Sequence, residues 1–414
     1  MTVRRSATAL AATAVLCGAT APLAFAAPSP APVIPSGLYG KADPTYDGVW
    51  RQSFALLAQH AVGLTPAPQA VDWLTGQQCA DGAFASFRPD AAKACDAKTM
   101  LDSNATAAAV QTLAVLGGHD AAVAKGVAWL KSVQNADGGW SYSPGTPSDA
   151  NSTSVVIGAL AAAGQKPAEV KSKTGKSGPD ALVTFQVGCA AQGADRGAFG
   201  YQPDKAGKLA PNADATAAAA LAGLGKYALV TPAGTDAPVA APTCPATGPA
   251  DAPAAAAGAA FYLAEALKKD GHLVAVTPGA DQPTADVGNT ADAVIALAAG
   301  GHKTAAAGAL TWLQKNGPAW AKGNPAGLAG LVLAAHAAGA DPKAFGGTDL
   351  VAQLNATGPA PQTATAAADG KKDEKKEKED KGGSSNVGWF LGAGAMAGIG
   401  IGFLLSSRRK KNQL

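Results

Sequence analysis

The stretch that most constrains this chain is residues 125–140, with the sequence KGVAWLKSVQNADGGW. Its first half spaces apolar side chains, including Trp129 and Leu130, along one face of a helix. The Asn-Ala-Asp-Gly-Gly run that follows predicts a tight turn. Asp137 can accept hydrogen bonds from nearby amides there, and glycine tolerates positive φ angles. We therefore expect Trp140 to fold back onto the helix that precedes it.

The same pattern recurs along the chain, and recurrence at intervals of several tens of residues indicates a repeat architecture. One copy has the core residues Gln78, Asp81, Gly82 and Phe84 after Trp73. A looser copy joins Phe185 and Gln186 to Gly197 and Phe199.

Residues 125–140 resemble the QW motif of terpene cyclases and protein prenyltransferases, also known as the prenyltransferase/squalene oxidase repeat. The matching residues are Lys125, Gly126, Trp129, Leu130, Gln134, Gly138 and Trp140. The resemblance covers most of residues 45–358 and implies an α/α toroid.

A second repeated element alternates with the QW-like helices. It consists of Asp or Asn, usually a threonine, and then a helix of small residues that reaches a leucine. Because short polar side chains accept hydrogen bonds from helix amides, we interpret the polar residues as N-caps. The interpreted caps are Asp47, Asn104, Asn151, Asp214, Asn289 and Asn324.

Larger apolar side chains mark the intervening helices, which the spacing predicts at Pro68–Gln77, Asp120–Gln134, Pro179–Ala190, Ala252–Lys269, Lys303–Lys315 and Thr348–Asn355. Strand signals are scarce, and alanine, the best helix former, dominates. Small residues allow helices to pack closely around an axis, whereas amphipathic helices cover them. We therefore predict an all-α fold, an (α/α)6 toroid with six inner and six outer helices.

The two ends predict export and a membrane anchor. Residues 1–26 have the basic start, apolar run and small-x-small end of a signal peptide. Residues 387–405 carry no charge and would span about 28 Å as a helix. The basic tail that follows, 406–414, favours a cytoplasmic C-terminus. We expect a Pro-rich linker at 27–44, the toroid at 45–358 and a disordered charged stalk at 359–386. The protein would cross the cell membrane once, with the toroid outside the cell.

Charge argues against a nucleic-acid partner. The formal net charge is +3, to which the signal peptide contributes +2, the basic tail +4 and the run 371–381 +1, which leaves −4 for the rest. A surface that binds nucleic acid is strongly basic.

Four cysteines remain once Cys17 is removed with the signal peptide, and no two have CxxC spacing. An even number in an exported chain indicates disulfides and not a metal site. Three pairings are possible. We favour Cys79 with Cys95 and Cys189 with Cys244, because each pair closes one loop after an outer helix.

The chemistry of the QW-repeat enzymes does not transfer to this sequence. Squalene-type cyclases use a DxDD acid motif, and protein prenyltransferases hold zinc with a set that includes an Asp-x-Cys step; neither sequence occurs here. We therefore assign no catalytic residue and no metal ligand, and expect a non-enzymatic role. A toroidal enzyme, either cyclase-like or polysaccharide-cleaving, and a protein-interaction scaffold remain alternatives.

The helix starts at Asp102 and Asp214 resemble the Asp-Thr-Ala-Ala starts of transcobalamin and intrinsic factor. That resemblance implies ligand capture, with cobalamin or another large cofactor as the ligand. No cofactor is required for the fold. Those relatives enclose cobalamin with a second β domain, so a partner would supply the lid here, either a separate lid domain or a membrane transporter.

The inner-helix N-termini of a toroid all point to one mouth, where free amides would favour polar or anionic groups. We expect ligand contacts there from four of the interpreted caps and from two residues beside them that we take to be freer, Asp102 and Asn212. The predicted ligand-binding set is Asp102, Asn104, Asn151, Asn212, Asp214 and Asn289.

Overall fold

The computed structural model describes residues 33–187, 191, 193–243, 245, 250–275 and 282–362. Within them the chain is helical, with a single pair of short strands, which confirms the all-α class. The predicted signal peptide, stalk and 387–405 span lie outside the described residues, as do Cys189 and Cys244. No helix in the described part has both the length and the apolar character needed to cross a membrane.

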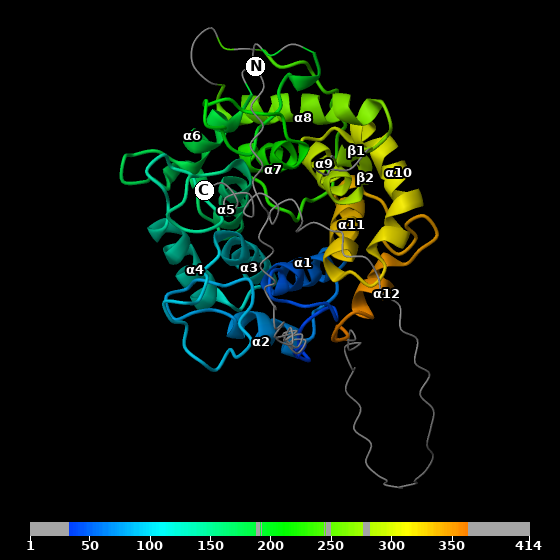
Figure 1. Cartoon of the computed structure of the whole chain (residues 1–414). Coiled ribbons are helices and arrows are strands. Elements are labelled where there is room, and N and C mark those ends of the chain that lie inside the picture. Colours follow the sequence, from blue (N-terminus) through cyan, green and yellow to red (C-terminus); the bar gives the residue numbers. More distant parts are fainter. Residues whose placement is uncertain are drawn as a thin grey trace, which may run out of the picture. The chain divides into compact units, whose positions relative to one another are not determined.

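Six inner helices close into a ring (Figure 1). Each packs against the next along the chain, and the last packs against the first. The inner helices are α1 (Gly48–Ala61), α3 (Ser103–Leu116), α5 (Ala150–Ala162), α7 (Ala213–Gly223), α9 (Val287–Ala299) and α11 (Pro325–Ala338).

A second set of six helices within the described residues surrounds this ring, each packed against the inner helix that precedes it. These outer helices are α2 (Pro68–Gly76), α4 (Asp120–Ser132), α6 (Gly178–Leu182), α8 (Ala252–Lys268), α10 (Lys303–Ala321) and α12 (Leu350–Asn355). The alternation predicted from the sequence is therefore present in the structure.

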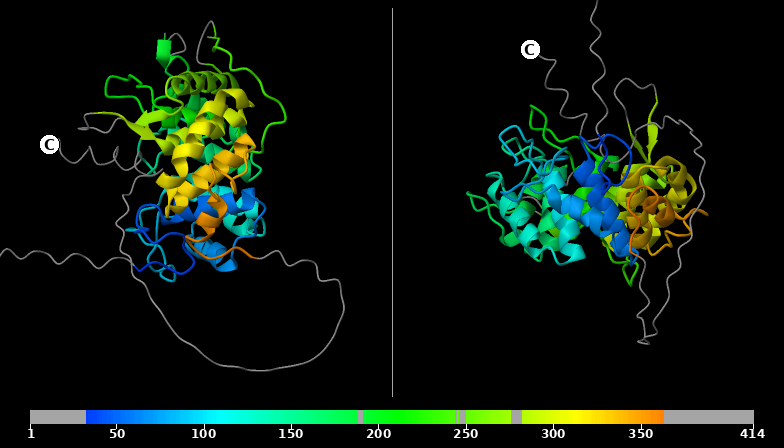
Figure 2. Two further views of the ribbon diagram at one scale, coloured as in Figure 1. Left: turned by 90° about the vertical axis from the view of Figure 1, so that its right-hand side faces the viewer. Right: turned by 90° about the horizontal axis from the view of Figure 1, so that it is seen from below.

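Smaller elements join the two rings. Three 3-10 turns lie between α5 and α7: η1 (Pro167–Glu169), η2 (Val183–Phe185) and η3 (Gly193–Asp195). Strands β1 (Leu273–Ala275) and β2 (Thr284–Asp286) form an antiparallel pair, with Leu273 opposite Asp286, and project from the body of helices beside α9 (Figure 2).

Small side chains allow the inner helices to lie close together. In α11, Leu328, Leu331 and Leu333 are fully buried, and so is Ala329 between the first two. A helix surrounded by protein needs apolar residues on every face, which is why α7 and α11 are poor in polar residues. The core consists of two clusters of buried apolar residues, the larger of them rich in alanine and leucine.

The turn after α4 forms as predicted. The indole nitrogen of Trp140 donates to the carbonyl oxygen of Leu130, 2.7 Å away, and the Trp140 ring is fully buried. Gly138 has a φ of +90°, and a Cβ there would lie 2.4 Å from the Ser177 carbonyl oxygen at the start of α6. The glycine is required both by the turn and by the next outer helix, so the motif joins successive repeats.

A cap and a threonine four residues later repeat at the start of four inner helices. Each threonine hydroxyl accepts a hydrogen bond from a backbone N–H in the segment before the helix, at 2.9–3.0 Å. The donors are Phe84, Trp140, Phe199 and Leu273, and the acceptors are Thr106, Thr153, Thr216 and Thr290, respectively. This bond fixes the segment before each of these four inner helices to the helix itself.

The predicted helix Pro179–Ala190 is wrong: the α-helix starts at Gly178 and ends at Leu182. Two β-branched residues follow, which helices tolerate poorly, and Gln186 then pairs with Phe199 in a β-bridge that needs extended backbone. The predicted end of α10 at Lys315 is also wrong, because the helix continues to Ala321 through a proline.

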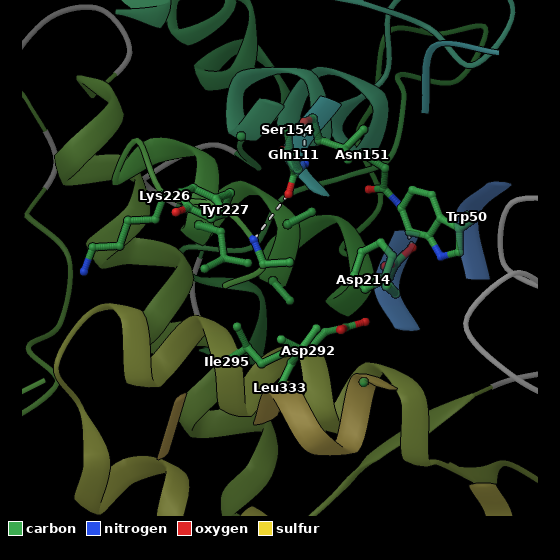
Figure 3. Close-up of a pocket in the computed structure, with 18 residues that line it drawn as sticks. Trp50, Gln111, Asn151, Ser154, Asp214, Lys226, Tyr227, Asp292, Ile295 and Leu333 are labelled. Atoms are coloured by element: carbon green, nitrogen blue, oxygen red, sulfur yellow. Dashed lines mark hydrogen bonds between the residues drawn. The ribbon is translucent and has the colours of Figure 1, made fainter. Parts of the chain in front are cut away.

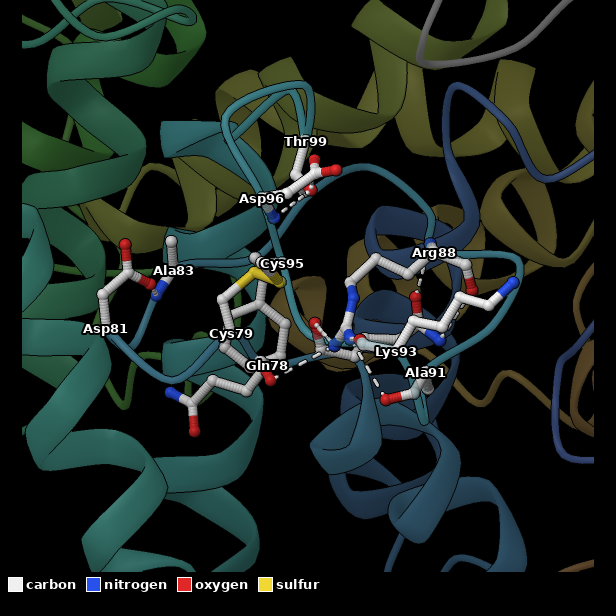
Figure 4. Close-up of a disulfide and its surroundings, with 12 residues drawn as sticks. Gln78, Cys79, Asp81, Ala83, Arg88, Ala91, Lys93, Cys95, Asp96 and Thr99 are labelled. Carbon is white, nitrogen blue, oxygen red and sulfur yellow. Dashed lines mark hydrogen bonds between the residues drawn. A yellow bond between two sulfur atoms is a disulfide. The ribbon is translucent and has the colours of Figure 1, made fainter.

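A disulfide joins Cys79 to Cys95, as predicted, with 5.6 Å between the Cα atoms (Figure 4). Arg88 lies within the loop that it closes. The Arg88 guanidinium donates to backbone carbonyls on both sides of the loop, including those of Gln77 at 3.2 Å and Ala91 at 3.0 Å. Disulfide and arginine together fix a loop that has little regular structure of its own.

Candidate functional site

All six inner helices contribute to a cavity of about 120 Å³ at the centre of the ring (Figure 3). The loop after α7 lines one end of it with Lys226, Tyr227 and Ala228. Figure 3 shows Trp50 and Asp214 at the other end, where the inner helices begin. The cavity therefore lies along the axis of the toroid.

Most of the lining is apolar. Leu221, Ile295 and Leu333 come from α7, α9 and α11, each near the middle or C-terminal half of its helix. Trp50 and Phe54 of α1 stack with ring centroids 4.7 Å apart and an angle of 30° between the rings. This apolar wall excludes water from one side and raises the cost of placing charge in the cavity.

Two carboxyl groups nevertheless face the cavity, Asp214 of α7 and Asp292 of α9. Asp214 accepts a hydrogen bond of 2.5 Å from the side-chain amide of Asn151 on α5. Asp292 has no side-chain hydrogen bond or ion pair among the described residues. Figure 3 shows its carboxyl pointing into the open space on the side where Asp214 lies.

The surroundings disfavour ionisation of both acids. Burial raises the pKa of Asp214 to about 6, although the Asn151 amide opposes the change, and the negative charges of Asp286 and Asp149 add to it. Burial raises the pKa of Asp292 to about 8, with further contributions from Asp214 and Asp286. Asp292 is therefore largely protonated at neutral pH.

Two polar atoms beside these acids are buried without a hydrogen-bond partner. They are Oδ1 of Asn151 and Oγ of Ser154, both on α5 and both in residues that line the cavity. Each residue is only 4% exposed. An unpaired buried polar atom costs about 1–3 kcal/mol, so both atoms favour any ligand that supplies a partner.

The structure brings two of the six predicted ligand-binding residues into this cavity, Asn151 and Asp214. Asn289 instead donates from its side chain to Asp286, 2.7 Å away. Asn104 lies in the first turn of α3 with its Oδ1 atom buried and unpaired, outside the cavity lining. Whether any of the six binds a ligand stays a prediction.

Our assignment of the caps is wrong for four helices. The N-caps are Asp102, Asp149, Asn212 and Asp286, whose side chains accept from amides in the first turn. Asn104, Asn151, Asp214 and Asn289 lie inside the helices, two or three residues later. Asp102 and Asn212 are therefore not freer than their neighbours. Asn324 is a cap as predicted, and Asp47 occupies the cap position without a side-chain bond.

The expected row of free amides at the mouth is also absent from the first three inner helices. The carbonyl oxygens of Ser86, Tyr142 and Tyr201 accept from the amides of Val49, Ser103 and Ala150, at 2.8, 3.1 and 3.0 Å. Each carbonyl belongs to the loop of the next repeat, so the loops cap the helices that precede them. At these three helices a first-turn amide is therefore already occupied by a loop carbonyl.

Asp102 also belongs to a buried polar cluster outside the cavity. Its Oδ2 atom accepts from Ser86 Oγ at 2.8 Å, and Ser86 Oγ lies 3.1 Å from the Tyr142 hydroxyl. Burial raises the pKa of Asp102 and that of the Tyr142 phenol. The cluster satisfies its members internally and joins the loop before α3, the α3 cap and the loop before α5.

Sequence reasoning missed Asp292 and Trp50. Asp292 lies three residues after Asn289, a spacing that places two helical residues on one face, and it is the lone charged residue inside α9. An acid in the interior of an alanine-rich helix was therefore the available signal. No group of three or more His, Cys, Asp or Glu side chains within the described residues has an arrangement that could hold a metal ion.

Comparison with known proteins gives no family. No protein-family model matches the chain, and no curated protein does. Among solved structures, an ent-copalyl diphosphate synthase from Streptomyces platensis is 17% identical with a TM-score of 0.45, and the alignment covers 70% of this chain but only 50% of the synthase. A protein from Actinoplanes is 15% identical with a TM-score of 0.46, over 74% of this chain and 95% of that one.

Proposed function

We propose that the toroid is a non-catalytic receptor that captures a small organic ligand in its central cavity. The observation that carries the proposal is the placement of two carboxyl groups, Asp214 and Asp292, in an otherwise apolar cavity. Apolar cavities with a few convergent polar groups are typical of ligand sites. The predicted export signal and the 387–405 span add that capture takes place outside the cell, at the membrane.

The size of the cavity limits what it can enclose. At about 120 Å³ it is smaller than the roughly 300–1,000 Å³ of pockets for drug-sized ligands. A corrinoid does not fit inside a cavity of this size. Cobalamin would have to lie across the mouth, with a lid domain or a transporter covering it, so a small ligand is the better proposal.

A toroidal enzyme is the second candidate, and one observation favours it. Burial raises the pKa of Asp292 to about 8, so its carboxyl can donate a proton near neutral pH, as a general acid must. An enzyme would convert the captured molecule, whereas a receptor would release it unchanged. Mass spectrometry of the ligand before and after incubation distinguishes the two.

Blocking the cavity tests the receptor proposal. Small molecules that co-purify with the full-length protein are identified by native mass spectrometry, for wild type and for Ala218→Phe, whose new ring would fill the cavity from α7. Ala307→Phe on the exposed face of α10 is the matched control. We expect the ligand to be lost from Ala218→Phe alone. If Ala218→Phe retains the ligand, the binding site lies outside the cavity.

A further inference from the structure

The charges around the cavity are unbalanced in one direction. Lys226 is the one basic residue in its lining, and its ammonium already donates to the Ala299 carbonyl oxygen, 2.6 Å away at the end of α9. The acids Asp214 and Asp292 face the cavity, and no base pairs with either among the described residues. A cationic ligand would supply the missing charge.

The acids outside the pair that act on it lie at the starts of two helices, α9 and α5. The charge of Asp286, at the start of α9, reaches both members of the pair, and the charge of Asp149, at the start of α5, reaches Asp214. The lining from α1, α3 and α11 has no titratable side chain; it includes Trp50, Gln111 and Leu333. The field inside the cavity is therefore negative once the acids ionise.

The unpaired polar atoms favour a ligand with several donors. Asn151 Oδ1 is an acceptor only, and an ionised Asp292 is an acceptor only. Both are without a partner among the described residues, and both lie in residues that line the cavity. Ser154 Oγ can accept as well. A primary ammonium has three N–H donors and no acceptor, and so matches this set.

The stacked pair Trp50 and Phe54 adds an aromatic wall. Aromatic faces attract cations and pack against apolar bodies. The cavity of about 120 Å³ is close in size to an engineered protein cavity of about 150 Å³ that binds benzene. The comparison therefore limits the apolar body of the ligand to about the size of one ring.

Resting on the proposed function, we propose that the ligand is a small primary ammonium ion on a compact apolar or aromatic body, held by Asp214, Asp292 and Asn151 against Trp50. The cation binds the ionised pair. The carboxyl that was protonated releases its proton to water on binding, and no covalent bond to the ligand forms or breaks. Affinity should therefore rise with pH while that carboxyl is still protonated in the free protein, and fall once the amine itself loses its proton, at about pH 10 for an alkylammonium.

Three probes of one shape test this inference by calorimetry on the full-length protein: benzylamine, benzyl alcohol and benzoate. At pH 8 we expect benzylamine to bind at least tenfold more tightly than benzyl alcohol, and benzoate not to bind. Titrations in phosphate and in Tris should differ in apparent enthalpy, because binding releases a proton. Equal affinities for amine and alcohol, or tighter binding of benzoate, would overturn the inference.

Variants separate this inference from the proposed function. Asp292→Asn should reduce benzylamine affinity at least tenfold and leave benzyl alcohol affinity unchanged, while Asp72→Asn, on the exposed face of α2, should change neither. Asp214→Asn is the second acid variant if the first fails to fold. Ala218→Phe should abolish both. If benzyl alcohol binds in the cavity and benzylamine does not, the proposal of a receptor is supported and the proposal of a cationic ligand is wrong. If neither binds to wild type, the receptor proposal itself loses its support.

Discussion

The indole N–H of Trp140 donates to the carbonyl oxygen of Leu130 across 2.7 Å, so the last residue of the turn closes onto the helix that leads into it. The same tryptophan receives support from the next inner helix, because its backbone N–H donates to Thr153 Oγ1 at 3.0 Å. One residue therefore connects an outer helix, its turn and the following inner helix.

Replacement of this tryptophan should destabilise the whole ring. Trp140→Ala removes a fully buried ring and should lower the free energy of unfolding by about 3–5 kcal/mol. Trp140→Phe keeps most of the apolar volume but leaves the Leu130 carbonyl without its donor, and should cost about 1–3 kcal/mol. Urea melts followed by circular dichroism measure both values. A loss below about 1 kcal/mol for the alanine variant would contradict this role.

Each of the repeated threonines should contribute to the free energy of unfolding. Thr153→Val and Thr216→Val keep the side-chain shape but leave the N–H groups of Trp140 and Phe199 unpaired. Each variant should cost about 1–3 kcal/mol in the same melts, the price of an unpaired buried donor. The control is Thr311→Val on the exposed face of α10, which should change stability by less than about 0.5 kcal/mol. Equal effects at buried and exposed threonines would rule out the proposed function of these bonds.

The alternation of the helices was predictable because two independent patterns repeat along the chain. Helix ends were less so. Gly317 and Pro318 read as a stop signal, yet α10 continues through them. A Cβ on Gly317 would lie 3.0 Å from the Leu331 side chain, and Ala321 is fully buried, so packing against α11 holds the last turns. Tertiary contacts of this kind are invisible in a local pattern.

The caps show a different limit. Asn and Asp stand both at the cap and two residues later in several inner helices, and either is a good cap by residue type. Which of the two residues is the cap depends on which one has non-helical backbone. The threonine four residues after Asp102 or Asn212 identifies the cap only when its bond to the preceding loop is known. Asp292 was missed because the other acid of the cavity, Asp214, is on a different helix, and a local pattern does not show that the two face the same space.

Reduction of the disulfide should destabilise the loop that contains Arg88. The two cysteines are 16 residues apart, and a cross-link over a loop of that length contributes about 3 kcal/mol. Cys79→Ser with Cys95→Ser should lose about that amount. Melts with and without dithiothreitol measure it, and the double variant, insensitive to the reductant at this loop, is the control. No difference between oxidised and reduced wild type would show that Arg88 alone holds the loop.

Peptide mapping of the non-reduced protein should give two linked pairs. The structure contains the bond between Cys79 and Cys95. The sequence predicts a second between Cys189 and Cys244, which lie outside the described residues. A peptide that joins Cys189 to Cys244 is the expected result. Free thiols at both positions, with the first pair intact, would make that prediction wrong.

Asp292→Asn should make stability less dependent on pH. Burial, with Asp214 and Asp286, raises the pKa of the Asp292 carboxyl to about 8, whereas an aspartate in an unfolded chain has a pKa of about 3.9. Between these values the folded protein holds a proton that the unfolded chain has released. Wild type therefore loses stability as the pH rises through that range, by at most about 1.4 kcal/mol per pH unit from this group. The asparagine is neutral throughout, so the variant should exceed wild type at both pH 5 and pH 8, by the larger amount at pH 8. Urea melts at both pH values measure this, with Asp72→Asn as the control, and an unchanged pH dependence in Asp292→Asn would mean that this carboxyl is ionised in the folded ring at neutral pH.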